Sequence, residues 1–161
     1  MRVLSVVPGP REHGVVLHGL TVARLLGTDV TRTLEPVEGA YDLTHVQFTD
    51  SLFGPDIASA AGAFERWAET APRPLVVTLH DVPGADADAA RDARRAAGYQ
   101  RVVDAADAVV VCSDHEASRL HPRPAVVPLP VEPLAAAGDC PWWADRPTVG
   151  VLGFVYPGKG H

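Results

Sequence analysis

The stretch that decides the fold is 2-RVLSVVPGPREHGVVLHGLTVARLLG-27, at the start of the chain. Residues 2–7 form a short β-branched run that ends at a Pro-Gly pair, which is typical of a buried strand. Over residues 15–26, apolar side chains recur at spacings that cover much of a helix surface, and Gly27 follows as a stop signal. The stretch therefore predicts a strand, a glycine-containing loop and a helix.

The rest of the chain alternates in the same way between short apolar runs and helical segments. Further strands are predicted at 28-TDVTRTL-34, 41-YDLTHVQF-48, 73-RPLVVTLHD-81, 107-DAVVVCS-113 and 125-AVVPLPV-131. Helices are predicted over about residues 55–71, with Pro55 in the first turn, and 85–106. Because strands and helices alternate throughout, we expect an α/β fold of the Rossmann-like, doubly wound type with a mostly parallel sheet.

Some of these elements carry more detailed expectations. The alternation in residues 28–34 leaves polar side chains on one face, which is typical of an edge strand, whereas the run in residues 107–113 indicates a strand buried on both faces. Gly98 is expected to weaken the middle of its helix. Ser113 and Glu116, three residues apart, predict a capping box at the start of another helix.

A second unit is indicated near the end of the chain. After a proline-rich piece, the segment 148-TVGVLGFVYPGKGH-161 begins a fresh strand and a glycine turn. Because a first strand with nothing after it cannot build a domain, we expect one domain at residues 1–146 and the start of a truncated C-terminal domain at 147–161. The sequence is then one domain of a larger protein.

Composition and charge exclude several classes of protein. The chain has 161 residues, 47% hydrophobic and 21% charged, which is typical of a globular domain. Its net charge of -6 comes from carboxylates spread along the sequence, so we expect no binding of nucleic acid. No apolar run is long enough for a signal peptide or a membrane span, and the two cysteines form no disulfide framework. We therefore expect a cytoplasmic protein.

Candidate site residues cluster in three loops that follow predicted strands. These loops are 8-PGPREHG-14, 48-FTDSLFG-54 and 80-HDVPG-84. Each contains a glycine and a group that can bind or charge a ligand. In a doubly wound sheet, ligands bind outside the carboxyl ends of the strands, so we expect the three loops to line one cleft.

The first loop runs from Gly9 to Gly14 into a helix whose free N–H groups can hold an anion or a sugar hydroxyl. The loop lacks the third glycine of a dinucleotide-binding fingerprint, and no Lys-Ser or Lys-Thr pair follows Gly14 as in a P-loop. NAD and ATP sites are therefore disfavoured. A tight strand-to-helix turn without a ligand is the alternative interpretation.

His80 is the strongest single candidate for chemistry. It ends an apolar strand and is followed by Asp81 and a Pro-Gly turn. It can donate a hydrogen bond to an oxygen that gains charge in a transition state, or it can cap the strand end through a backbone bond. His13 and His18, five residues apart, are a poor helical pair for a metal, and no carboxylate motif completes a site. We expect no metal.

Several segments in order resemble a known family. They are 13-HGVVLHGLTVARLLG-27, 41-YDLTHVQFTDSLFG-54, 74-PLVVTLHD-81, 105-AADAVVVCSDHEASRL-120, 126-VVPLPV-131 and 149-VGVLGFVYPGKG-160. Together they cover nearly the whole chain and resemble the N-terminal domain of the retaining glycosyltransferases of family 4. The resemblance implies the N-terminal half of a GT-B fold, which has two Rossmann domains.

The resemblance also implies roles for single residues. Lys159, the only lysine of the chain, would contact the diphosphate of a nucleotide-sugar donor, and Gly14 would lie where the glycine loop approaches the donor phosphates or the acceptor. Phe154 departs from the family, which often has an arginine there as a second cation. His80 resembles the family's histidine beside the transferred sugar. The candidates for acceptor binding are Gly9, His13, Asp50 and Asp81.

The implied function is that of a retaining glycosyltransferase, which moves a hexose from a nucleotide diphosphate sugar to a hydroxyl of a sugar, polyol or lipid-linked acceptor. The donor is a substrate, and no cofactor is implied. In such enzymes the departing phosphate helps to deprotonate the acceptor, and most of the donor site lies in the C-terminal domain, so this chain alone is expected to be inactive. The alternative, which Phe154 favours, is a non-catalytic Rossmann-like or flavodoxin-like domain that binds a small anionic ligand.

Overall fold

The computed structural model describes residues 1–84, 88–130 and 147, and residues 1–130 form one compact unit. Within these residues, parallel strands form one sheet in the order β2-β1-β3-β4-β5-β6. The strands are β1 (Val3–Val6), β2 (Asp29–Thr31), β3 (Leu43–Phe48), β4 (Leu75–Leu79), β5 (Ala108–Val111) and β6 (Ala125–Val126). The predicted Rossmann-like parallel sheet is therefore confirmed, with β2 at an edge.

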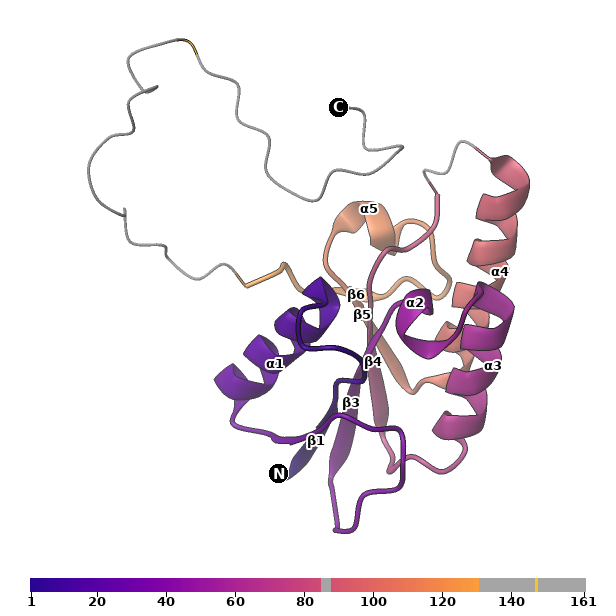
Figure 1. Cartoon of the computed structure of the whole chain (residues 1–161). Coiled ribbons are helices and arrows are strands. Elements are labelled where there is room, and N and C mark those ends of the chain that lie inside the picture. The colour runs from indigo at the N-terminus through magenta and orange to yellow at the C-terminus, as the bar shows by residue number, and fades with distance from the viewer. Residues whose placement is uncertain (85–87, 131–146, 148–161) are drawn as a thin grey trace. The chain divides into compact units, whose positions relative to one another are not determined.

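Helices cover both faces of this sheet. They are α1 (Gly14–Leu26), α2 (Asp50–Phe53), α3 (Ile57–Ala68), α4 (Ala89–Ala105) and α5 (Asp114–Ala117). Figure 1 shows α1 on one face of the sheet and α3 with α4 on the other. The sheet is thus doubly wound, as the alternation of elements predicts.

The two faces of the sheet differ in chemistry. Residues of alternate parity point to opposite faces of a strand, and the register places Val46 beside Val77 on the face under α3 and α4. That face holds the aromatic core, in which Phe48 packs edge-to-face against Phe64 and Tyr99. The face under α1 is more polar and carries Ser5, His45, Gln47 and Thr78.

Two glycines allow helices to approach their neighbours closely. A Cβ at Gly19 of α1 would lie 2.6 Å from Cγ of Gln47, so only glycine lets α1 pack this closely on β3. A Cβ at Gly98 of α4 would lie 2.3 Å from Cγ1 of Ile57 in α3. Gly98 was expected to weaken its helix, but its lack of a side chain lets α3 pack closely against α4 at this position.

Some local predictions are confirmed and others are wrong. Ser113 caps α5, since its Oγ accepts from the Glu116 N–H at 3.2 Å. The helix expected over residues 55–71 begins only after Asp56, whose carboxylate accepts from the Ser59 N–H, so Pro55 precedes the helix. The separate α2 was not predicted because four residues show no helical periodicity.

Strand β5 corrects the prediction of a strand buried on both faces. Val111 is fully buried, whereas Val109 and Val110 are half-buried and Ala108 is exposed. Helix α1 packs against β1, β2 and β3, and the face beyond it opens into a hollow of about 330 Å³ lined partly by Val76 and Val110. An apolar run alone does not reveal how far a covering helix extends.

Candidate functional site

The predicted loops gather at the carboxyl ends of the strands. Gly9 follows β1 with a φ of 105°, and a Cβ there would lie 2.6 Å from Cδ2 of Leu52 in α2. The β1–α1 loop therefore lies against the segment that follows β3. Positive φ and this close approach both require glycine at position 9.

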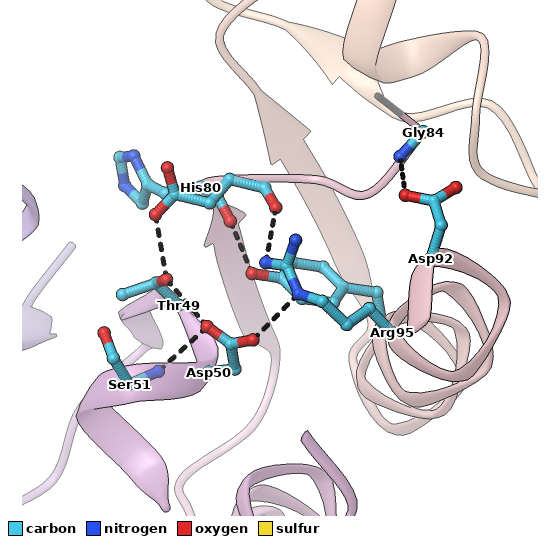
Figure 2. Close-up of polar contacts among 9 residues, drawn as sticks. Thr49, Asp50, Ser51, His80, Gly84, Asp92 and Arg95 are labelled. Carbon is cyan, nitrogen blue, oxygen red and sulfur yellow. Dashed lines mark hydrogen bonds and ion pairs between the residues drawn. The ribbon is translucent and has the colours of Figure 1, made fainter. Parts of the chain in front are cut away.

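The segments after β3 and β4 are joined by polar contacts, which Figure 2 shows. The Thr49 hydroxyl donates to Asp81 Oδ2 at 3.0 Å. Arg95 of α4 donates from Nε to Asp50 Oδ2 and from Nη2 to the Asp81 carbonyl, both at 3.0 Å. Two of the predicted site carboxylates, Asp50 and Asp81, are thus brought together by residues that were not predicted.

Arg95 is held in a partly buried ion pair. Its side chain is 20% exposed and that of Asp50 is 24% exposed. Burial alone would lower the pKa of the guanidinium, but the hydrogen bond and the charge of Asp50 outweigh burial and raise it. Asp50 also accepts from the Ser51 N–H at 3.0 Å, so its carboxylate is fixed in position.

Asp81 has an unusual backbone. Its φ is 55°, in the left-handed region that residues other than glycine seldom adopt, although Asp and Asn tolerate it best. The residue is exposed, and its carbonyl and carboxylate both have partners in the contacts above. Such conformations persist where surrounding contacts determine them, and they cluster at functional sites.

His80 lies at the junction of these segments and is almost fully buried, with 8% exposure. Its backbone N–H donates to Phe48 O at 2.9 Å, and its carbonyl accepts from the Tyr99 hydroxyl at 2.7 Å. The ring of His18 stands edge-on to its imidazole at 5.0 Å between centroids. Figure 2 shows the imidazole pointing away from the Arg95–Asp50 pair.

A chain of polar side chains sets the state of the His80 ring. His80 Nε2 lies 2.9 Å from Gln47 Oε1, and Gln47 Nε2 lies 3.2 Å from His45 Nε2. His45 Nε2 also lies 2.7 Å from the Thr78 hydroxyl. Because an amide oxygen only accepts, the proton of a neutral His80 ring sits on Nε2 and is donated to Gln47.

His45 and His80 are both neutral near pH 7. Burial, with a smaller effect of the His18 charge, lowers the pKa of His45 and of His80 to about 4. The single proton of the neutral His80 ring is on Nε2 and is donated to Gln47, so Nδ1 is unprotonated and carries a lone pair. In this tautomer Nδ1 can accept a hydrogen bond but cannot donate one, whereas one of the two roles predicted for His80 was that of a donor.

The β1–α1 loop contains the remaining described candidates. His13 is the N-cap of α1, and its Nδ1 accepts from the Val15 N–H at 3.3 Å, so that nitrogen has a structural role. Gly14 opens the helix, and a Cβ there would meet nothing within 4 Å. Gly14 therefore leaves open space at the N-terminal end of α1.

Neither a group of metal ligands nor a membrane-spanning helix occurs among the described residues. No group of three or more His, Cys, Asp or Glu side chains in residues 1–84 and 88–130 could hold a metal ion. In the same part of the chain, no helix has the length and apolar character needed to cross a membrane. Lys159 and Phe154 lie outside the described residues, so their roles stay predictions.

Comparison with known proteins identifies the family. The family described as "Glycosyl transferase 4-like domain" matches residues 1–135, which include every described strand. The chain belongs to this family. Neither the curated proteins nor the solved structures give a significant match.

The resemblance to the N-terminal domain of family 4 glycosyltransferases is therefore confirmed, and the all-parallel sheet is consistent with one half of a GT-B fold. In this glycosyltransferase domain, Thr49, Gln47 and Arg95 are site residues that the sequence alone did not indicate. Period-two alternation could have indicated Gln47, since His45 and Gln47 in β3 fall on the same face of the sheet as Thr78 in β4. Arg95 carried no such signal because it lies on an arginine-rich helix.

Proposed function

We propose that this glycosyltransferase domain forms the acceptor side of a retaining hexosyltransferase. The reaction would move a hexose from a nucleotide diphosphate sugar to a hydroxyl of a sugar, polyol or lipid-linked acceptor. Support comes from the family match over residues 1–135 and from the polar groups at the carboxyl edge of its parallel sheet. The polypeptide that completes the donor site would be a second Rossmann domain beginning near residue 147.

The observation that carries the proposal is the joint fixation of His80, Asp50 and Asp81 at one edge of the sheet. Gln47 of β3 is hydrogen-bonded to His80, and Arg95 of α4 is hydrogen-bonded to Asp50. Thr49, directly after β3, donates to Asp81. Hydrogen bonds from such supporting residues hold polar groups in the geometry that a substrate requires.

The roles follow from the chemistry of each group. Neutral His80 accepts a hydrogen bond from a sugar hydroxyl through Nδ1, and the exposed Asp81 carboxylate accepts from an acceptor hydroxyl. The open space at Gly14 admits a phosphate or a sugar to the N-terminal end of α1. Lys159, Gly9, His13 and Asp50 keep the donor or acceptor roles proposed from the resemblance.

No described side chain needs to act as a strong base in this scheme. The departing phosphate takes the acceptor proton on the same face of the sugar, while the protein supplies position and electrostatic stabilisation. Lys159, as a compact cation, would stabilise the charge that develops on the leaving diphosphate.

Ligand-observed NMR of the 161-residue chain tests the proposal, with UDP, GDP, UDP-glucose, GDP-mannose and a panel of sugars and polyols. We expect at least one sugar or polyol to bind, nucleotides to bind weakly or not at all, and Asp81→Asn to weaken the sugar signal. Asp114→Asn, an exposed change on α5, is the matched control. Tight nucleotide binding without sugar binding would instead favour a non-catalytic domain for a small anionic ligand.

A further inference from the structure

A hollow adjoins the candidate site, between the start of α4 and the segment that leads into α3. It measures about 320 Å³ and is lined by Asp50, Pro55, Asp56, Arg91, Arg94 and Arg95, among others. This volume falls in the range of small-molecule sites. Asp50 and Arg95 are shared with the candidate site, so the hollow is continuous with the proposed acceptor edge.

The carboxylates of this arginine hollow already have partners. Asp50 accepts from Arg95 at 3.0 Å and from the Ser51 N–H. Asp56 accepts from the N–H and the hydroxyl of Ser59 at 2.8 and 3.0 Å, which lowers the pKa of this carboxyl and keeps it ionised. Both carboxylates are therefore held by protein donors, and three guanidinium groups line the same hollow.

Arg91 and Arg94 bring two more guanidinium groups to the hollow. They lie three residues apart in the first turns of α4, on adjacent positions of one helix face, and both are exposed. Asp88, the N-cap of α4, attracts both guanidinium groups, but it does not line the hollow. The positive end of the α4 dipole adds to the potential at this point. Three of the arginines of the chain thus lie within five residues of α4, at positions 91, 94 and 95.

We propose that the arginine hollow binds a phosphate monoester carried by a soluble acceptor, a sugar or polyol phosphate. The acceptor assignment rests on the proposed function, whereas the phosphate assignment rests on the hollow alone. A guanidinium group offers up to five N–H donors in a planar fork that matches phosphate oxygens. A phosphate monoester carries close to two negative charges, which suits two adjacent arginines better than the single charge of a carboxylate.

The test measures binding of inorganic phosphate, glucose 6-phosphate and glucose to the 161-residue chain by NMR titration. The variant is the double change Arg91→Gln and Arg94→Gln, and the control is Arg66→Gln on α3, which makes a charge change of the same kind outside the hollow. We expect the double variant to bind both phosphate compounds at least about tenfold more weakly, as loss of charge-assisted hydrogen bonds implies. The control should bind as the wild type does.

Equal affinity for phosphate compounds in the wild type and the double variant would overturn the proposal. A sedimentation assay with phosphatidylcholine vesicles, with and without phosphatidic acid, separates a lipid headgroup from a soluble phosphate. Arginine-dependent recruitment to phosphatidic acid without binding of glucose 6-phosphate would overturn the soluble assignment. Binding of unphosphorylated sugars with no binding of phosphate would refute the phosphate site and leave the proposed function standing. Binding of inorganic phosphate with no binding of sugars would refute the proposed function and leave the phosphate site standing.

Discussion

Lowering the pH from 7 to 5 should destabilise this domain through His45, which is half-buried, and His80, which is almost fully buried. The pKa of His45 and of His80 is about 4 in the folded state, against an ordinary value of 6.5. Between pH 6.5 and 4 the unfolded chain therefore binds more protons than the folded chain, and the free energy of unfolding falls as the pH falls. Below about pH 4 this contribution levels off, because both states are then protonated.

The magnitude follows from the two pKa values. At pH 5 each histidine costs about 2 kcal/mol relative to pH 7, or about 4 kcal/mol together. A domain of this size has about 5–15 kcal/mol of stability in total, so the loss is a large fraction of it. Paired carboxylates such as Asp56 and Asp107, whose pKa values are lowered from 3.8, lose their contributions mainly below pH 4. The two effects therefore fall in different pH ranges.

Urea denaturation followed by circular dichroism at intervals from pH 7.5 to 4.5 measures this dependence. His45→Gln should remove about half of the fall between pH 7 and 5, whereas His115→Gln, an exposed change on α5, should leave it unchanged. A free energy of unfolding that stays constant over this range would refute the burial argument. The same holds if His45→Gln and His115→Gln show the same slope.

Three further predictions test single contacts. Gln47→Met removes the acceptor of the His80 Nε2 proton, so ¹⁵N NMR of the ring should show a mixture of tautomers in place of the Nε2–H form; an unchanged spectrum would contradict the assigned hydrogen bond. Gly98→Ala should lower the free energy of unfolding by about 1–2 kcal/mol in spite of its better helix propensity, because the new Cβ would lie 2.3 Å from Ile57 Cγ1; a gain in stability would show that α3 and α4 can separate easily. Thr44→Val should raise the melting temperature, with a gain of about 1 kcal/mol, because the buried Thr44 hydroxyl has no hydrogen-bond partner among the described residues; a loss would indicate a bound water.

The order and type of the main elements could be predicted from the sequence. β-Branched runs, helical spacings and the helix end at Gly27 each depend on a few neighbouring residues, so they can be recognised without the tertiary structure. The prediction failed where an element is too short for periodicity, as at Asp50–Phe53, and where burial depends on a distant helix, as for β5. The loops that hold the site were predicted for the same reason as the sheet, since parallel strands direct their carboxyl ends to one edge.

The contacts that fix the site were decided only by the tertiary structure. Gln47 and His80 are 33 residues apart, and Asp50 and Arg95 are 45 residues apart. Their meeting depends on the register of β3 against β4 and on the position of α4, neither of which any local pattern encodes. The sequence by itself therefore determined a doubly wound sheet and which loops lie at its carboxyl edge. Packing decided that His80 is neutral and donates its Nε2 proton to Gln47, because burial and the Gln47 amide act on it only in the folded chain.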